Sequence, residues 1–216
     1  MNIGVVGASG KSGTLIVEEL LARNYSVTGI VRNQYKLKHK DIAIIEKDLF
    51  ELTNEDLEGI DVLVYAFATW GEDLPIQENA ITHVLKCVKD TTIRLIVVGG
   101  AGSLYVDKKK SLKLKDTPTF PESIYPVANI GDKVLNQLKE SPFSTWTYFS
   151  PAESFLFEGK RTEEFFMSDD QLPVNDEGKS QISYADYAVA LVDEIEAKQF
   201  IGKQCSVGAK KSYKLD

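Results

Sequence analysis

The sequence feature that most restricts the fold of this chain is a glycine-rich turn close to the amino terminus. Gly7, Gly10 and Gly13 recur at every third position, directly after the short apolar run 3–6. Glycine permits a tight turn from a strand into a helix and lets a pyrophosphate approach the backbone closely. Free N–H groups and the positive end of the helix dipole would then face the phosphates. The turn therefore predicts dinucleotide binding.

Polar side chains in the same turn are expected to add hydrogen-bond donors around the pyrophosphate. They are Ser9, Lys11 and Ser12. The Gly10-Lys11-Ser12 run does not make a Walker-type phosphate loop, because no glycine stands at the required distance before it. A three-glycine turn is a weak signal alone, and its place after a buried strand strengthens it.

The rest of the chain alternates short β-branched runs with longer amphipathic segments, which is typical of a parallel sheet covered by helices on both faces. Strands are predicted at 3–6, 26–31, 42–46, 61–66, 93–98, 144–149 and 204–207, and helices at 11–23, 76–89 and 122–139. We expect an α/β, Rossmann-like doubly wound sheet in three α/β/α layers. One domain, 1–216, is predicted, with residues 151–182 as a small cap over the cleft, irregular over 152–179. Ser183 and Asp186 are predicted to form the capping box of a last helix.

The end of the second predicted strand bears on the choice between NAD and NADP. An NAD site usually offers an acidic residue to the ribose hydroxyls about 20 residues after the glycines. This strand ends at Arg32 with no acid beside it in sequence. A planar guanidinium suits a 2′-phosphate or stacks on adenine, so NADP (as NADPH) is expected in preference to NAD.

Further cofactor contacts are expected where the other strands end. Asp48 and Leu49 follow the third strand, where an aspartate can accept the adenine amino proton and a leucine can pack on the ring. Small residues after the fourth and fifth strands leave room for the ribose and nicotinamide. The residues expected there are Ala66, Phe67, Ala68, Gly99 and Gly100.

Composition excludes several other classes of protein. The 25 basic and 32 acidic residues give a net charge of −7, which argues against a nucleic-acid or anionic-membrane partner. Cys87 and Cys205 lie far apart without metal-ligand spacing, so reduced buried thiols, no metal and a cytoplasmic location are expected. The amino-terminal run lacks a signal-peptide layout, and no apolar run reaches the length of a membrane helix.

Several sequence blocks together resemble one family. The glycine turn is similar to that of the atypical short-chain dehydrogenases, and further blocks resemble bacterial NADH-flavin reductases, close to NmrA-like proteins and biliverdin-reductase-B-type flavin reductases. Those blocks are 97–104, 150–152 and 182–188. The resemblance implies a bound NAD(P)H whose nicotinamide faces a shallow pocket roofed by the segment after Pro151. The residues expected around this pocket are Trp70, Ser103, Tyr125, Ser150, Pro151 and Glu153.

The chain departs from the short-chain dehydrogenase pattern at its catalytic centre. That pattern has a lysine four residues after a tyrosine, where the ammonium promotes proton transfer by the phenol. Tyr125 is followed at that spacing by Asn129, and Lys133 lies two helical turns on, about 12 Å away by rise. We therefore predict no catalytic acid, and favour an acceptor that takes hydride without one.

The function expected is an NAD(P)H-dependent reductase that passes hydride to a flat acceptor, either a flavin (FMN or FAD as substrate) or a quinone. A flavin delocalises the incoming charge, so proximity and orientation of the two rings suffice. Two alternatives stay open: a non-catalytic NADP-sensing regulator of the NmrA-like kind, and a sugar-nucleotide epimerase-like enzyme. The partner is expected to be a small-molecule acceptor, and the protein a monomer or homodimer.

Overall fold

Eight strands form one sheet in the order β3-β2-β1-β4-β5-β6-β10-β8. The computed structural model describes residues 1–213, so the last three residues of the predicted domain lie outside the described residues. Its strands are β1 Asn2–Val6, β2 Ser26–Val31, β3 Ala43–Glu46, β4 Val62–Tyr65, β5 Arg94–Val98, β6 Trp146–Pro151, β7 Ser154–Leu156, β8 Phe165–Ser168, β9 Gln181–Ser183 and β10 Lys203–Ala209. Its longer helices are α1 Lys11–Ala22, α2 Ile76–Val88, α3 Tyr125–Glu140 and α4 Tyr184–Ala197.

The winding of the sheet reverses at β1. This strand pairs in parallel with β2 on one side and with β4 on the other, so that Ile3 faces both Val27 and Val62. Seven of the eight strands run parallel, and only β8 is antiparallel to its neighbour β10. In such a sheet, ligands bind at the carboxyl ends of the strands where the order reverses, which places the glycine turn at the expected crevice.

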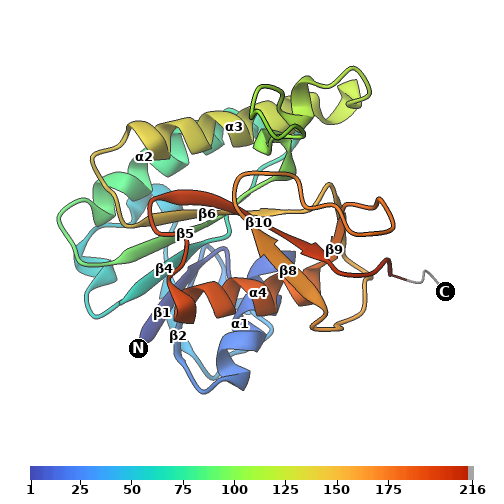
Figure 1. Cartoon of the computed structure of the whole chain (residues 1–216). Coiled ribbons are helices and arrows are strands. Elements are labelled where there is room, and N and C mark those ends of the chain that lie inside the picture. Colours follow the sequence, from blue (N-terminus) through green and yellow to red (C-terminus); the bar gives the residue numbers. More distant parts are fainter. Residues whose placement is uncertain (214–216) are drawn as a thin grey trace.

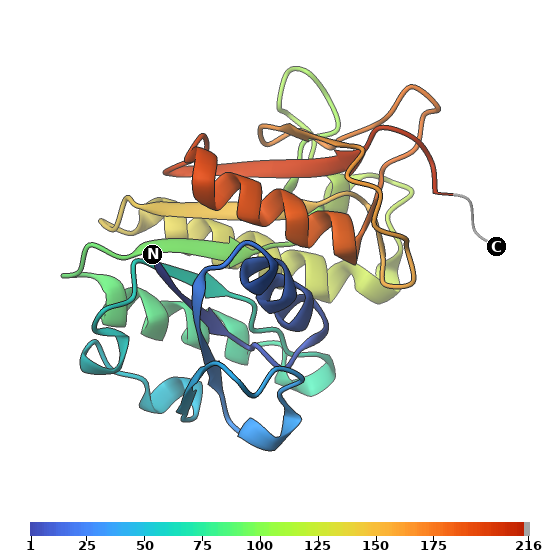
Figure 2. The same ribbon diagram turned by 90° about the horizontal axis from the view of Figure 1, so that it is seen from below.

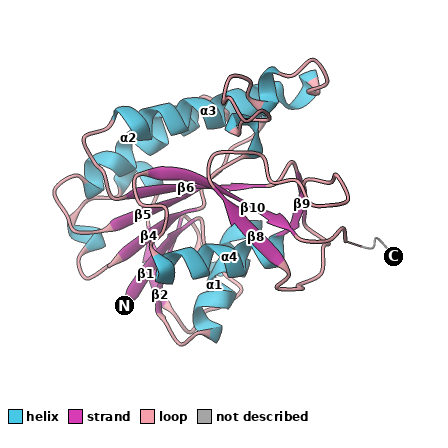
Figure 3. Cartoon of the chain, in the orientation of Figure 1, coloured by secondary structure: helices cyan, strands magenta, loops and turns pink. Residues whose placement is uncertain are grey.

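Helices cover both faces of the sheet (Figures 1 and 3). Viewed from below, α1 and α4 lie side by side on one face, and α2 and α3 cover the other (Figure 2). Along β4, Val62 and Val64 pack toward α1 and α4, whereas Leu63 and Tyr65 pack toward α2 and α3. This alternation explains the continuous apolar strands, because both sides of each strand are buried. Among the described residues, no helix combines the length and apolar character needed to cross a bilayer.

Two predictions differ from the structure by more than two residues. The helix predicted from residue 122 begins at Tyr125, because Glu122–Ile124 forms a separate 3-10 turn before it. The segment 152–179, predicted to be irregular, contains β7 and β8. That prediction was wrong because β8 pairs with β10, which is remote in sequence, and such pairing leaves no local pattern.

The start of α4 confirms one half of the predicted capping box. The Ser183 hydroxyl accepts a hydrogen bond of 2.9 Å from the Asp186 N–H. The Asp186 carboxylate does not bond back to Ser183. It accepts hydrogen bonds from the N–H groups of Thr162 and Glu163, each at 2.8 Å, and from the Tyr213 hydroxyl at 2.7 Å. Asp186 therefore ties the segment 162–163 and Tyr213 to α4.

Candidate active site

Gly7 stands at the point where the sheet order reverses. Its N–H donates to the Ile30 carbonyl of β2 at 3.0 Å, and a Cβ placed on it would lie 2.7 Å from the Ala66 carbonyl oxygen after β4. Its φ of +76° lies in the left-handed region that favours glycine. The backbone of the turn therefore passes directly between the ends of β2 and β4, where no side chain fits.

The turn leaves its helix start open to a ligand. A Cβ on Gly13 would come within 2.1 Å of the Gly7 carbonyl oxygen, so the first turn of α1 packs directly on the loop. No side chain caps α1 at Gly10, and the first helical hydrogen bond is donated by Thr14 to the Gly10 carbonyl at 2.9 Å. The three N–H groups before Thr14 have no partner within the helix, which suits a bound pyrophosphate.

The polar side chains of the turn lie around this opening. Ser9 and Ser12 are half-buried, and Lys11 is exposed. The Lys11 ammonium lies 4.6 Å from the centre of the Phe157 ring. Segment 151–182, in which Phe157 lies, therefore reaches the glycine turn, a contact between residues that sequence spacing does not indicate.

Arg32 follows β2 directly. Its side chain is exposed, and no hydrogen bond or ion pair involves it within residues 1–213. The sequence of β2 contains no acidic residue at its end, but the neighbouring strand β3 places Glu46 beside Val31 of β2. Both Glu46 oxygens accept hydrogen bonds from Gln34, from its N–H at 3.0 Å and its side chain at 2.8 Å. Sequence reasoning missed Glu46 because only the strand order brings it beside β2.

Asp48 and Leu49 open a short 3-10 turn after β3. The Asp48 carboxylate accepts the Phe50 N–H at 3.0 Å, and Glu51 completes a capping box with the Asp48 N–H. Leu49 is 5% exposed and belongs to the same core cluster as Leu52, so little of its side chain is open to an adenine ring. Asp48 is half-buried, with its second carboxylate oxygen outside these hydrogen bonds.

The ends of β4 and β5 supply the small residues expected near a nicotinamide. Ala66 donates its N–H to the Val6 carbonyl at 3.0 Å, Phe67 is half-buried and Ala68 is exposed. A Cβ on Gly99 would lie 2.3 Å from the Tyr148 ring.

The Tyr148 hydroxyl accepts the Gly100 N–H at 3.3 Å and donates to the Gly131 carbonyl at 3.0 Å. Burial raises the pKa of Tyr148 far above its usual range, so this hydroxyl is a structural group that stays neutral.

The residues expected around the acceptor pocket divide into a buried and an exposed group. Ser103 and Ser150 are buried, and the Gln204 side chain donates to both hydroxyls, at 2.8 and 3.0 Å. Pro151 is also buried, at the end of β6. The exposed group comprises Trp70, Tyr125 and Glu153.

The lysine that lies against Tyr125 is not Lys133 of the same helix. The Lys133 ammonium pairs with Glu78 of α2 at 2.9 Å. The Lys115 ammonium, from the 3-10 turn Leu114–Asp116, lies 5.7 Å from the centre of the Tyr125 ring. Spacing along one helix could not indicate this lysine, because it lies on the loop that precedes α3.

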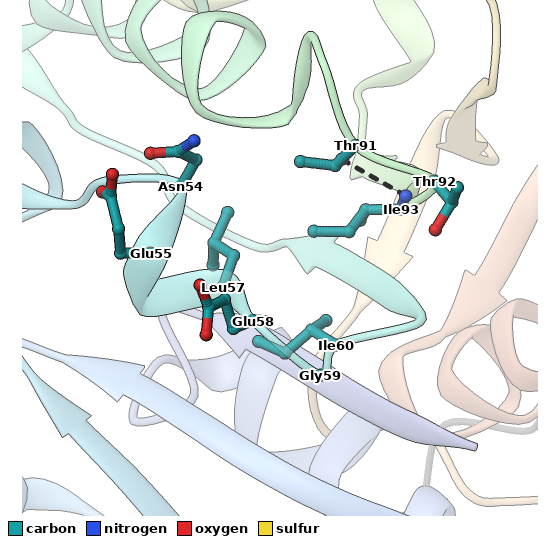
Figure 4. A pocket seen from close by; sticks show the side chains of 9 residues that line it. All are labelled: Asn54, Glu55, Leu57, Glu58, Gly59, Ile60, Thr91, Thr92 and Ile93. Carbon is teal, nitrogen blue, oxygen red and sulfur yellow. Dashed lines mark hydrogen bonds between the residues drawn. The ribbon is translucent and has the colours of Figure 1, made fainter.

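Two cavities lie at different distances from the predicted site residues. One, of about 330 Å³, lies at the amino-terminal ends of β4 and β5, whereas the glycine turn follows the carboxyl end of β1. Figure 4 shows the residues that line this cavity. Its lining includes Glu55, Glu58 and Thr91, and it contains none of the predicted site residues. The other, of about 440 Å³, lies at the start of α3 and includes Tyr125. Within residues 1–213, no group of three or more metal-ligating side chains forms a cluster.

Comparisons with known proteins agree with this geometry. A family model described as NAD(P)H-binding matches residues 7–198. The uncharacterized Bacillus subtilis protein YwnB is 46% identical over 199 residues, which is 91% of this chain and 92% of YwnB.

Two solved structures extend the comparison. One, of a Streptococcus pneumoniae protein provisionally described as an NADH-flavin reductase, is 40% identical with a TM-score of 0.92, covering 97% of this chain and 100% of that one. Another, of a Bacteroides thetaiotaomicron protein provisionally described as an epimerase, is 30% identical with a TM-score of 0.87, covering 99% of each chain.

Proposed function

Because this chain belongs to the NAD(P)H-binding family, we propose that it is an oxidoreductase that reduces a flat aromatic acceptor, a flavin or a quinone. The similar Streptococcus protein, with its provisional flavin-reductase description, supports a redox role. The similar Bacteroides protein makes an epimerase-like role the main rival.

The observation that carries the proposal is the backbone cradle at the reversal of the sheet. Gly7 and Gly13 leave no room for a Cβ, and the start of α1 presents N–H groups without helical partners. Such a cradle fits a pyrophosphate, with Lys11 and Ser12 within the first turn of the helix. Reduced nicotinamide supplies the hydride when the dinucleotide is bound.

The residues at the far end of the crevice support a preference for NADPH. Arg32 is exposed and unpaired among the described residues, so its guanidinium is free to meet a 2′-phosphate. Glu46 is the nearest acid by register, and Gln34 occupies both of its oxygens. A carboxylate engaged in this way is less available to ribose hydroxyls than the free acid of an NAD site.

The acceptor class follows from what the chain offers for proton transfer. Asn129 stands four residues after Tyr125, and the ammonium of Lys115 is hydrogen-bonded to Asp116 at 2.8 Å. The chain's task is then to hold the two rings close together in the right orientation, while solvent provides the proton. Flavins and quinones suit this arrangement better than ketones, whose reduction leaves an alkoxide that needs an acid.

The test is to mix the protein with NADPH and either FMN, riboflavin or a benzoquinone, and to follow the nicotinamide absorbance. Steady oxidation above the protein-free rate is expected. Tight NADPH binding without oxidation over this panel would favour the NADP-sensing regulator. Turnover of a sugar nucleotide without net NADPH consumption would favour the epimerase-like role.

A further inference from the structure

The cavity at the start of α3 has the walls of an aromatic binding site. It has a volume of about 440 Å³, and its apolar walls are Pro118, Phe120, Tyr125 and Pro126. Tyr125 is 40% exposed, so one part of its ring is free for stacking.

The cavity lies on the same side of the sheet as the predicted nicotinamide site. The 3-10 turn Ala101–Ser103 follows β5 and packs on α3, where a Cβ on Gly102 would lie 2.6 Å from that of Ala128. Ala128 is three residues after Tyr125, and residues at this spacing share one face of a helix. The Tyr125 side of α3 is therefore turned toward the carboxyl end of β5.

Among the described residues that line the cavity, Lys115 is the one cation, and nearby acids already balance its charge. The Lys115 ammonium lies 2.8 Å from Asp116 and 3.6 Å from Asp132, whose other oxygen pairs with Lys113 at 2.6 Å. Burial alone would lower the pKa of Lys115, but the hydrogen bond to Asp116 and the two negative charges outweigh it and raise the pKa. Lys115 therefore stays charged at neutral pH, with its charge compensated and with ammonium hydrogens left for an incoming carbonyl oxygen.

Glu122 gives the cavity a negative charge that no neighbouring cation among the described residues balances. Its side chain lines the cavity and is exposed, and no hydrogen bond or ion pair holds it within the described part of the chain. A phosphate bound nearby would meet this carboxylate without a free cation to balance it. An uncharged ring with carbonyl oxygens would meet Tyr125 and Lys115 without that repulsion.

We infer that this cavity binds an uncharged planar acceptor with carbonyl oxygens, a quinone or the unphosphorylated flavin riboflavin, and disfavours flavins that carry a phosphate. The inference rests on the proposed function and specifies its acceptor. Tyr125 supplies the stacking face, Lys115 the donor to a carbonyl oxygen, and Glu122 the repulsion of a phosphate.

Riboflavin and FMN make a matched pair of probes, because they share one ring system and differ in the phosphate. Their dissociation constants are measured by flavin fluorescence with oxidised NADP present, so that no turnover occurs. Riboflavin is expected to bind about threefold to fivefold more tightly at low salt, the scale of an interaction between exposed charges. The ratio should approach one at about 1 M salt, where the screening length falls to about 3 Å.

Substitutions at Glu122 and Tyr125, with a control for each, separate charge from stacking. Glu122→Gln should bring the two constants together by tightening FMN alone, whereas Glu140→Gln, at the exposed far end of α3, should change neither. Tyr125→Ala should weaken both flavins about tenfold and keep their ratio, and Tyr125→Phe should restore both.

The possible failures are distinguishable. FMN binding as tightly as riboflavin, or a ratio that Glu122→Gln leaves unchanged, would overturn the assigned discrimination. Failure of both flavins to bind while NADP still binds would overturn the acceptor cavity itself. A protein that binds no nicotinamide dinucleotide would instead refute the proposed function on which the inference rests.

Discussion

Gly7 and Ala66 meet backbone to backbone where the sheet order reverses. A Cβ on Gly7 would lie 2.7 Å from the Ala66 carbonyl oxygen, and the N–H of Ala66 donates to the Val6 carbonyl at 3.0 Å. The ends of β1 and β4 are thereby held together directly under the predicted dinucleotide. Backbone cannot move aside as a flexible side chain can, so substitutions in this turn should be costly.

Gly13→Ala is expected to lower the free energy of unfolding by about 1–3 kcal/mol, because the new Cβ would collide with the Gly7 carbonyl oxygen. The variant should also lose dinucleotide affinity. For stability, Gly100→Ala is the matched control, since nothing lies within 4 Å of its Cβ position and its φ is −124°. Urea denaturation of both variants checks this, and equal stability losses would contradict it.

Arg32→Ala is expected to weaken NADPH about tenfold and NADH far less, because the guanidinium would contact only the 2′-phosphate. Calorimetric titration with each dinucleotide measures the two losses. Lys40→Ala, another exposed cation in the segment after β2, should leave both affinities unchanged. Equal losses for NADPH and NADH in Arg32→Ala would refute the cofactor preference.

The carboxylate of Glu19 is expected to make the free energy of unfolding fall at acidic pH. It is 4% exposed and lies between Arg23 and Arg161. Burial raises its pKa, but the hydrogen bonds and charges of both arginines outweigh burial and hold the pKa below the ordinary value of 4.5. A lowered pKa gives stability that is present above about pH 4.5 and is lost as the pH falls through the native value.

Glu19→Gln is therefore expected to cost about 2 kcal/mol at neutral pH and to flatten this acid dependence. Glu58→Gln serves as the control, because the Glu58 side chain is exposed and makes no hydrogen bond or ion pair with the described residues. Unfolding curves taken between neutral pH and about pH 3 would test the sign. If the free energy of unfolding of Glu19→Gln still falls with pH as steeply as that of the wild type, another group causes the acid dependence.

Ser183→Ala is expected to cost about 1 kcal/mol by removing the cap of α4. Asp186→Ala should cost more, about 3 kcal/mol, because it removes a fully buried carboxylate and leaves the N–H groups of Thr162 and Glu163 without their acceptor. Asp176→Ala replaces an exposed acid of the segment 151–182 and should leave the free energy of unfolding unchanged. The order of the three denaturation midpoints decides whether Asp186 holds this segment.

The two tryptophans differ in exposure, so their fluorescence is expected to respond to different parts of the molecule. Trp70 is 68% exposed after β4, whereas Trp146 is 5% exposed in β6. Binding of NADP or riboflavin is expected to quench part of the tryptophan fluorescence through Trp70. Trp70→Phe should remove that change, and a quench that persists in this variant would place the ligand elsewhere.

The elements that follow from local pattern were predicted closely. The strand expected at 26–31 is β2, Ser26–Val31, and the helix expected at 76–89 is α2, Ile76–Val88. Apolar periodicity and glycine turns act over a few residues, so they are visible in the chain itself. The start of α3 was misplaced, because a 3-10 turn before Tyr125 has almost the same composition as a helix start.

The sequence by itself determined the sheet class, the glycine turn and the position of a cation, Arg32, directly after the second strand, because these depend on neighbours in the chain. Only the tertiary structure decided that Glu46 stands beside β2, that Lys115 lies against Tyr125, and that Asp186 holds a distant segment. Each of these pairs joins residues whose distance is set by strand order and loop path, and no local pattern records that distance. The glycine turn predicts that a dinucleotide binds, and the folded chain arranges what the dinucleotide would face.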